Sequence, residues 1–497
     1  MKLLLGFVAT SVAWCAIAGS VISWDAEKTS GSWSDGANWV GGAAPGGEDA
    51  ALFTVGASAA ISVGIDQPVS VSNIWVYGGG KVTLKAAGAT QVMVTGNTAN
   101  GVEVNKVKTA GSGRQSVYVT GGSTLVVDGI AVTNSQTTTY HDLQMNQAST
   151  LIITNGAEFV MPVRLPASGA SAVNNDTFTV VVTGEGSKLA KTGGSTQIRG
   201  VGGRIYCENG GRVEDQLSWY TKPNDLVYSF KNGSFSFAGT LDLYGDNCQL
   251  ILDEGSSGNC STSVQLIDLH NSQFFIRNGS TFETASFRWG YQKSTKNVCL
   301  VTNATLTVTG YMTLGANKGN DTTHSKSNAV VIAKDGVLNC PPGQQAQTFD
   351  VGLHSEDDLL FIDGGTMTDA RVTRIGSEDC LDTVFKVRGE TASVSFTKAL
   401  TFDNAATLAC ELPLPTDHAV MTSTSTVTIN PGTKFAVTLP EGFTPGTYTI
   451  LTANSISGTI ADADISVTGK GECRLVQDGT SIKMTVKSKS GLKVIVR

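Results

Sequence analysis

Two short acidic segments contain the residue types that acid–base chemistry or calcium binding would need. Their candidate residues are Glu356, Asp357 and Asp358 in the first segment, Glu378, Asp379 and Asp382 in the second, and His354 just before the first. Both segments lie between similar apolar runs, about one repeat apart. If the repeats stack, their carboxylates lie close together. They could then form an acid–base pair for glycoside cleavage or an oxygen-ligated Ca²⁺ site.

The alternative interpretation is a solvated acidic edge, because Asp and Glu are ordinary turn residues. The spacing matches neither an EF-hand loop nor the nonapeptide calcium repeat. We therefore favour the solvated edge and assign no catalytic residue, no metal ligand and no cofactor.

A basic stretch precedes these acidic segments. Its members are Lys293, Lys296, Lys318, His324 and Lys326. A change from basic to acidic loops along one edge could select a charged glycan or a protein partner, so we treat the basic and acidic residues together as a candidate binding surface.

Other motifs and the overall charge exclude several classes of function. The five His residues form no H-E-x-x-H motif, and the chain has no G-x-S-x-G elbow and no G-x-x-x-x-G-K-[ST] loop. The net charge is −7 over 497 residues, whereas a nucleic-acid binder needs a basic face. We expect neither a serine hydrolase nor a nucleic-acid partner.

The first residues, "MKLLLGFVATSVAWCAIAGS", predict a secretory signal peptide at 1–18. Lys2 is followed by an apolar run, and Ala16 to Ala18 form an A-x-A-type cleavage site. The run is short for a membrane span, and no later stretch is apolar enough for one. We expect a secreted or cell-surface protein with no membrane span after cleavage.

Eight cysteines follow this segment, and none forms a C-x-x-C pair. An even number in an exported chain permits disulfides. Cys207 and Cys299 fall at apolar positions of the repeat described next, so we expect them to be core residues. Some of the other six could pair between neighbouring repeats.

The chain repeats a short apolar strand followed by a Gly-containing turn. Eleven copies, such as "LIITNGAEF" and "FFIRNGSTF", run from about Val117 to Ala392 in steps of 22 to 34 residues. Gly is abundant at 57 residues and charged residues are scarce at 15%, a composition that favours strands and turns. In the copy "VTNATL" Asn303 replaces the Gly and can adopt the left-handed conformation.

Residues two and four before each turn are apolar, which places them on one face of a strand. Ile153 with Leu151 is one such pair, and the first and ninth copies contribute Val119 with Val117 and Ala333 with Val331. We expect the residues between them to be polar or small and to face solvent. One short strand cannot bury its apolar face, but stacked copies can.

This pattern predicts an all-β fold, a right-handed parallel β-helix (solenoid). Eleven coils at about 4.8 Å each would form a rod roughly 50 Å long. A β-propeller is the alternative, but its blades need about 40–45 residues at an even repeat. We place the N-terminal Trp-rich cap and first coils at 19–110, the β-helix repeats at 111–403, and a small C-terminal β domain or cap at 404–497.

A second Gly precedes several of the strands, and the loop after it varies in length and charge. These glycines are Gly200, Gly245, Gly290, Gly315, Gly352 and Gly376. In stacked coils the same turn of every repeat lies on one edge, so we expect the variable loops, which hold the basic and acidic residues above, to form a ridge along the rod.

The N-terminal region holds Trp24, Trp33 and Trp39 among Gly and Asp residues. Trp faces can stack on sugars, but an end coil must also cover its apolar face. We favour the cap over the sugar platform. After about Asn404, Pro-Gly turns and alternating strands such as "TYTILTA" indicate the C-terminal β region.

The Trp spacing, followed by Pro45, Asp49, Ala51 and Phe53, resembles the autotransporter-passenger-like β-strand repeat proteins of Gram-negative bacteria. The "NGG" turn and the late "GTYTILTA" segment add to the resemblance, which covers nearly all of the predicted mature chain. It implies an exported bacterial β-helix, commonly with an adhesive or structural role, and supplies no catalytic residues. The chain to Arg497 leaves no room for a membrane barrel, so we expect neither self-translocation nor attachment through one.

We therefore predict a non-enzymatic surface or extracellular protein that presents a loop ridge to glycans or to other proteins. A polysaccharide-active lyase or hydrolase, with its chemistry near His354 to Asp382, is the first alternative. The second is a self-assembling surface-lattice subunit, so self-association is also expected.

Overall fold

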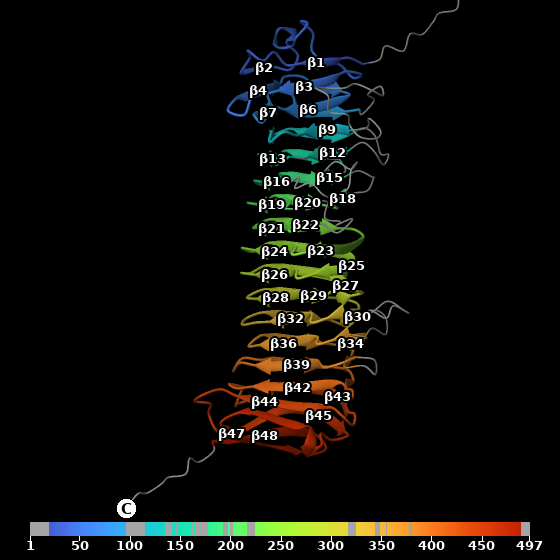
Figure 1. Cartoon of the computed structure of the whole chain (residues 1–497), viewed down its shortest axis with the longest axis vertical. Helices are drawn as coiled ribbons and strands as arrows, with labels where there is room; N and C mark the ends of the chain where they lie inside the picture. The colour runs from blue at the N-terminus through green and yellow to red at the C-terminus, as the bar shows by residue number, and fades with distance from the viewer. Residues whose placement is uncertain are drawn as a thin grey trace, which may run out of the picture.

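The computed structural model of the chain is a parallel β-solenoid of about 14 turns. This confirms the all-β parallel solenoid that the sequence predicts. Figure 1 shows a rod whose N-terminal and C-terminal strands lie at opposite ends. The structure describes residues 19–95, 115–134, 142–145, 147–161, 163–165, 177–191, 197–198, 202–215, 224–316, 325–342, 348–353, 355–376 and 380–488. The predicted signal peptide lies outside these residues. None of the helices in this described part has the length and apolar content needed to cross a membrane.

Most of the described turns contribute strands to three sides of the rod, and the strands of one side pair in parallel with those of the turns above and below. Sheet I runs the full length of the rod (Figure 1). Its strands are β2 (Ser30–Ser32), β4 (Ala60–Ile65), β7 (Lys81–Ala86), β10 (Thr124–Asp128), β13 (Ser149–Thr154), β16 (Phe178–Thr183), β19 (Arg204–Glu208), β21 (Val227–Lys231), β24 (Gln249–Asp253), β26 (Gln273–Arg277), β28 (Val298–Thr302), β32 (Ala329–Ile332), β36 (Leu359–Asp363), β39 (Thr383–Arg388), β42 (Ala406–Glu411), β44 (Lys434–Leu439) and β46 (Ile465–Gly469).

From β4 onward, sheet II follows sheet I along the chain. Its strands are β5 (Val69–Val71), β8 (Gln91–Val94), β11 (Ala131–Asn134), β14 (Glu158–Val160), β17 (Lys188–Ala190), β20 (Arg212–Glu214), β22 (Ser234–Phe237), the first parts of β25 (Ser257–His270) and β27 (Thr281–Tyr291), β29 (Thr305–Val308), β33 (Val337–Cys340), β37 (Thr366–Asp369), β40 (Ser393–Phe396) and the first part of β43 (Met421–Ile429).

Sheet III lies on the third side, and its described strands fall into two sections. The first contains β1 (Val21–Ser23), β3 (Ala50–Thr54), β6 (Asn73–Tyr77), β9 (Gln115–Val119), β12 (Asp142–Met145), β15 (Val163–Leu165) and β18 (Gln197–Ile198). The second contains β23 (Thr240–Asp246), the second parts of β25, β27 and β43, β30 (Met312–Ala316), β34 (Thr348–Leu353), β38 (Val372–Ile375) and β41 (Leu400–Phe402), and it continues into β45 (Gly446–Ser457).

Alternation along each strand places the core inside the rod. In β26, Phe274 and Ile276 are 1% and 0% exposed, and they stack in register on Leu250 and Leu252 of β24. Burying an apolar side chain of this size contributes about 1.5–3 kcal/mol. One strand cannot bury such a face alone, so stability comes from the contact between like positions of neighbouring turns.

For two of the eleven repeat copies, the residues predicted for the inward columns of sheet I are wrong. Val117 and Val119 are buried, but they lie in β9 of sheet III and stack on Ile74 and Val76 of β6, because the Gly turn after them leads into sheet I. In β32 the inward residues are Val330 and Ile332, both 0% exposed, whereas Val331 and Ala333 face outward. The turn before Gly336 is one residue longer than in the other copies, and counting back from that Gly shifts the register by one.

The prediction that polar or small residues separate the inward columns is also wrong for sheet I. Most of the outward-facing residues at the strand centres are apolar, among them Ile152, Val181, Ile251 and Leu300. The number of turns is higher than the eleven copies counted, because the parallel stack extends on both sides of Val117–Ala392.

The N-terminal indoles are part of the core. Trp24, Trp33 and Trp39 are 4%, 2% and 2% exposed, and each ring lies 5.6–6.1 Å from the Phe53 ring, centroid to centroid. The Trp39 Nε1–H donates to the Trp33 carbonyl over 2.8 Å. The indole faces therefore pack against protein and are not available to a sugar.

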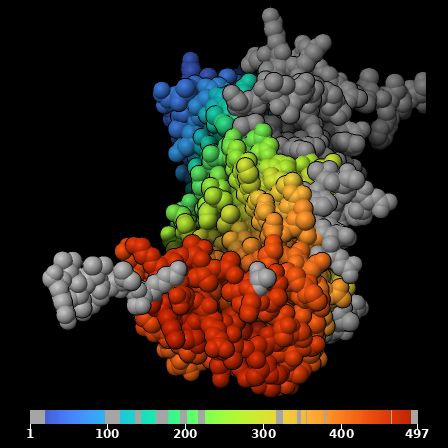
Figure 2. Space-filling view, turned by 60° about the horizontal axis from the view of Figure 1, so that its bottom comes forward, coloured from blue at the N-terminus to red at the C-terminus, as the bar shows by residue number. Residues whose placement is uncertain are grey.

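The parallel stack continues past Asn404 through β42, β44 and β46. Only then do antiparallel pairs follow: β47 (Gly471–Gln477) pairs with β48 (Ser481–Ser488), and β48 pairs with β45. Figure 2 shows these C-terminal residues as the broad near end of the rod.

Candidate functional site

The turn that leads from sheet III into sheet I forms a continuous edge, here called the turn ridge. In each turn it consists of the two residues that precede a buried side chain at the start of a sheet I strand. Its described members in the second half of the rod are Asn224 and Asp225, Asp246 and Asn247, His270 and Asn271, Thr295 and Lys296, Lys326 and Ser327, Glu356 and Asp357, and Leu381 and Asp382.

Backbone hydrogen bonds fix the turn ridge. In each turn the second ridge residue has a left-handed backbone, for example Lys296 with φ 56° and Asp357 with φ 56°. Its N–H donates to the carbonyl of the first ridge residue of the next turn, as from Lys296 to Lys326 over 2.9 Å and from Asp357 to Leu381 over 3.1 Å. The ridge therefore has a constant backbone, while its exposed side chains change from turn to turn.

A buried polar ladder lies directly beneath the ridge. Its members are Ser272, Asn297, Asn328 and Asp358, which are 0–2% exposed. Each side chain accepts a hydrogen bond from the backbone N–H of its equivalent in the preceding turn: Ser272 N to Asn297 Oδ1 is 3.0 Å, and Asn328 N to Asp358 Oδ1 is 2.9 Å. Asn297 Nδ2 also donates to Asn328 Oδ1 over 2.9 Å. These bonds satisfy backbone N–H groups and amide side chains that would otherwise be costly inside the rod, whereas Asp358 Oδ2 has no hydrogen-bond partner among the described residues.

The ladder was not predicted, although the sequence carries a signal for it. A polar residue precedes each of several apolar sheet I strands, and the residue before it adopts the left-handed conformation that Asn and Asp tolerate best. The glycines that make room for the ladder were predicted at this turn. Gly290, Gly315 and Gly352 have φ of 75°, 69° and 73°.

A side chain at these glycines would meet the ladder of the next turn. A Cβ at Gly315 would overlap the Asp358 carboxyl and the Ser355 hydroxyl, and one at Gly290 would overlap Asn328. Of the six glycines predicted at this turn, Gly200 lies outside the described residues.

Asp358 is the one ladder member that can ionise. Burial raises the pKa of its carboxyl to about 7, although hydrogen bonds from the backbone and side chain of Asn328 act in the opposite direction. The charge of Asp357 raises that pKa further. The cause is burial inside the rod rather than a cleft open to substrate, so the prediction that Asp358 belongs to an exposed acidic edge is wrong.

The structure places the other acidic candidates on the outside. Glu356 is half-buried, and Asp357 and Asp382 are exposed. The turns stack as expected, with Glu356 bridged to Leu381 and Val384 N bonded to the carbonyl of Asp358. Even so, Asp357 and Asp382 point away from the buried Asp358. His354, Glu378 and Asp379 lie outside the described residues.

The basic candidates lie farther along the same edge. Lys293, Lys296 and Lys326 are exposed. Lys326 forms an ion pair with Glu356 of the next turn, and Asp382 pairs with Lys434 Nζ at 3.4 Å. Lys318 and His324 lie outside the described residues. The basic and acidic parts of the ridge therefore meet at the ion pair between Lys326 and Glu356.

Of the acidic candidates that the structure describes, Asp357 and Asp382 are exposed at equivalent positions of successive turns. Within the part of the chain that the structure describes, no three His, Cys, Asp or Glu side chains lie close enough together to hold a metal ion. The exposed ridge offers charges and hydrogen-bonding groups at a spacing of one set per turn, which a partner with a matching repeat could contact.

A second buried charge cluster lies where sheet II meets sheet III. Arg371 Nε donates to Asp369 Oδ1 over 2.8 Å, Arg371 Nη1 donates to the Gly310 carbonyl, and the two charged residues are 3% and 0% exposed. The Arg371 guanidinium also lies 5.4 Å from the centre of the Phe349 ring. This pair joins three turns and is closed to solvent, so we assign it a structural role.

The eight cysteines from Cys207 to Cys473 are free thiols, and all except Cys473 are buried. Cys207 and Cys299 are core residues as predicted, with 0% exposure. Burial raises the pKa of Cys207, Cys248 and Cys340 to about 12. The disulfides that the sequence permitted between neighbouring repeats do not form here.

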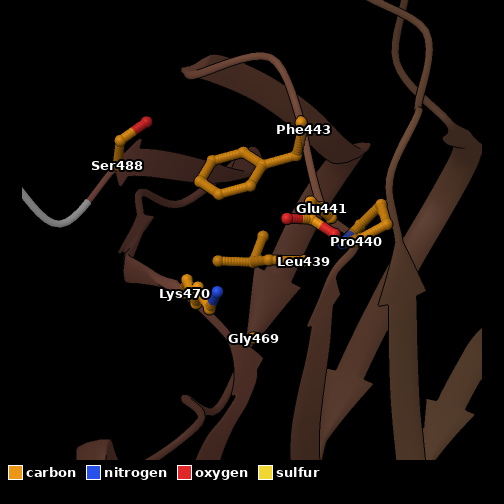
Figure 3. Close-up of a pocket in the computed structure, with 8 residues that line it drawn as sticks. Leu439, Pro440, Glu441, Phe443, Gly469, Lys470 and Ser488 are labelled. Carbon is orange, nitrogen blue, oxygen red and sulfur yellow. The ribbon is translucent and has the colours of Figure 1, made fainter.

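A pocket of about 370 Å³ lies at the C-terminal end of the rod (Figure 3). Its lining residues are Leu439, Pro440, Glu441, Gly442, Phe443, Gly469, Lys470 and Ser488. Phe443 and Leu439 supply an apolar wall, and Glu441 and Lys470 bring opposite charges to it. The volume is at the lower end of the range for small-molecule sites, but no set of convergent catalytic groups accompanies it among the described residues.

Comparison with known proteins assigns this chain to no family. The chain matches no known family's sequence profile, and a search of curated proteins finds no match.

Proposed function

We propose that this chain is an exported, non-enzymatic rod of the cell surface or extracellular space that presents its turn ridge to glycans or to other proteins. The observation that supports this proposal is the ridge itself. Its backbone repeats in the described turns from Asn224 to Asp382, whereas its exposed side chains change from Lys296 and Lys326 to Glu356, Asp357 and Asp382. Variable side chains on a constant scaffold are typical of binding surfaces.

The proposal also includes export through the segment 1–18 and kinship with autotransporter-passenger-like repeat proteins of bacteria. Both rest on the sequence patterns alone, and the parallel β-solenoid is compatible with the second.

A polysaccharide-active enzyme is the second candidate function. The raised pKa of Asp358 is the observation in its favour, because a general acid needs a carboxyl that stays protonated near neutral pH. Its burial argues against it, since a catalytic acid must reach the substrate.

The test uses the predicted mature chain, from Gly19 onward, with a panel of neutral, acidic and sulfated polysaccharides. Retention on each polymer and release of shortened chains are both measured. We expect retention on charged polymers without release. A ridge variant, Asp357→Asn with Asp382→Asn, should change retention, whereas the control Glu283→Gln with Asp335→Asn, away from the ridge, should not.

Release of products that Asp358→Asn abolishes would contradict the non-enzymatic proposal and support the second candidate. Retention that is the same in the ridge variant and in the control would contradict the role of the ridge.

A further inference from the structure

The outward face of sheet I carries an apolar stripe along most of the rod. The apolar stripe consists of Val126, Ile152, Val181, Tyr206, Ile251, Phe275, Leu300, Val331 and Phe361. These side chains stack in register on successive strands from β10 to β36, with Ser229 as the one polar residue among them. Apart from Val126, at 9%, the apolar members are half-buried, because each lies between neighbours above and below and exposes only its outer part.

The stacking of the solenoid does not require this stripe. The equivalent outward positions of sheet II are mostly hydroxyl, amide and charged residues: Ser236, Asn259, Glu283, Thr307, Asn339, Thr368 and Ser395. The same rod therefore has one polar and one apolar outer face. An apolar patch that continues over so many strands is typical of an interaction surface.

We propose that the apolar stripe is the interface between two copies of this chain, which pack face to face through sheet I. Flat sheets pack at about 10 Å with their strands within about 30° of each other. A partner that meshes along the whole stripe must repeat with the same period of about 4.8 Å, which a second copy provides.

The size of the face fits this partner. Ten strands have nine spacings, so the sheet I face from β10 to β36 is about 43 Å long, and five-residue strands make it about 16 Å wide. The product, roughly 690 Å², approaches the ~800 Å² that each partner contributes to a stable interface.

The charges beside the stripe also favour a second copy. Asp253 pairs with Arg277 at 2.7 Å, and Arg388 pairs with both Asp363 and Glu411. Because these charges are neutralised within one chain, the face selects no partner of opposite sign, and two copies can meet without like-charge repulsion.

Two of the three aromatic rings of the stripe, Phe275 and Phe361, are poorly placed for sugars. The Arg277 guanidinium lies 5.8 Å from the Phe275 ring centre, and Lys386 and Arg388 lie 4.9 and 5.1 Å from that of Phe361. These cations cover ring faces on which a sugar would have to stack, and the aliphatic residues between the rings offer no stacking surface.

The test is sedimentation of the predicted mature chain across the micromolar range. We expect a concentration-dependent species of twice the chain mass that persists at high salt, since apolar contacts are not screened. The triple variant Phe275→Thr, Leu300→Thr and Phe361→Thr should have a dimer dissociation constant raised by roughly 100-fold or more, because central apolar side chains dominate interface energies. Thr suits strands, so the fold should be kept.

The matched control places the same residue type on the other face: Glu283→Thr with Asn339→Thr should associate as the wild type does. A wild-type chain that stays monomeric would overturn the proposal, as would a folded triple variant that still dimerises. If the triple variant does not fold, Leu300→Thr alone provides the comparison. A dimer that dissociates at high salt would be held by charged residues, and this result would also overturn the proposal.

Discussion

The outward faces of sheet I and sheet II differ, although the same turns build both. Leu300 and Val331 occupy the strand centres of sheet I, where Thr307 and Asn339 occupy those of sheet II. The inward faces of the two sheets are alike, since Val301 and Leu306 are both fully buried. Stacking therefore constrains the residue types inside the rod but not those on its outer faces. The apolar outer face of sheet I needs another explanation, and we propose that it packs against a second copy of the chain.

The two edges of sheet I differ in the same way. The turn before each strand covers the buried polar ladder, and a Cβ at Gly315 would overlap it. In the turn after β24, Gly255 has φ 77°, and a Cβ there would meet no atom within 4 Å. The entry edge of sheet I is packed, whereas this exit turn is open.

The largest expected effect is a dependence of the free energy of unfolding on pH, which arises from Asp358 at the packed edge. The folded chain keeps the Asp358 proton up to about pH 7, whereas the unfolded chain releases it near 3.8. The free energy of unfolding should therefore fall as pH rises between these values. The fall is on the order of 4 kcal/mol at about 1.4 kcal/mol per pKa unit.

Asp358→Asn replaces the carboxyl with an amide that cannot ionise. Denaturant titrations at several pH values should show the variant more stable than wild type above pH 7 and similar below pH 4. Parallel pH profiles for the two proteins would show that the Asp358 carboxyl is not responsible.

The second effect compares the two faces of one strand. Ile276→Ala removes a fully buried side chain and should lower the free energy of unfolding by about 3 kcal/mol. Phe275→Ala, on the outward face of β26, should cost about 1 kcal/mol or less in the dilute chain. Thermal or urea unfolding measures both, and equal losses would mean that the outward face packs as a core does.

The third effect compares the two edges. Gly315→Ala combines left-handed strain with overlap on Asp358 and should cost about 2–3 kcal/mol. Gly255→Ala has the strain alone and should cost about 1 kcal/mol. Urea unfolding of both variants measures the difference, and a Gly255→Ala loss as large as that of Gly315→Ala would remove the distinction between packed and open edges.

The smallest effect lies on the ridge. Lys296 adopts φ 56°, which an Asn tolerates better, so Lys296→Asn should stabilise the rod by about 0.5–1 kcal/mol. Asn271, the equivalent residue one turn earlier, is already Asn with φ 49°. Asn271→Lys should lower the melting temperature, and a rise would contradict the left-handed ridge.

The sequence predicted the parallel solenoid because strand alternation and Gly turns are local signals. Asn303, with φ 45°, replaces a turn Gly as expected. The register of β32 was missed because one extra turn residue shifts a count made from Gly336. Asp358 was placed outside because adjacent acidic residues look alike in sequence, whereas the left-handed turn at Asp357 leaves that side chain in solvent and places Asp358 inside the rod. The right-handed coil stays a prediction.

The central claim is that the outside of sheet I is an interface and the outside of sheet II is not. Hydroxyl-radical footprinting of the predicted mature chain at low and high concentration, read by mass spectrometry, tests it residue by residue. We predict that Phe275, Leu300 and Phe361 become protected at high concentration, while Val337 on sheet II is labelled equally at both. Equal labelling of the sheet I residues at both concentrations would contradict the claim.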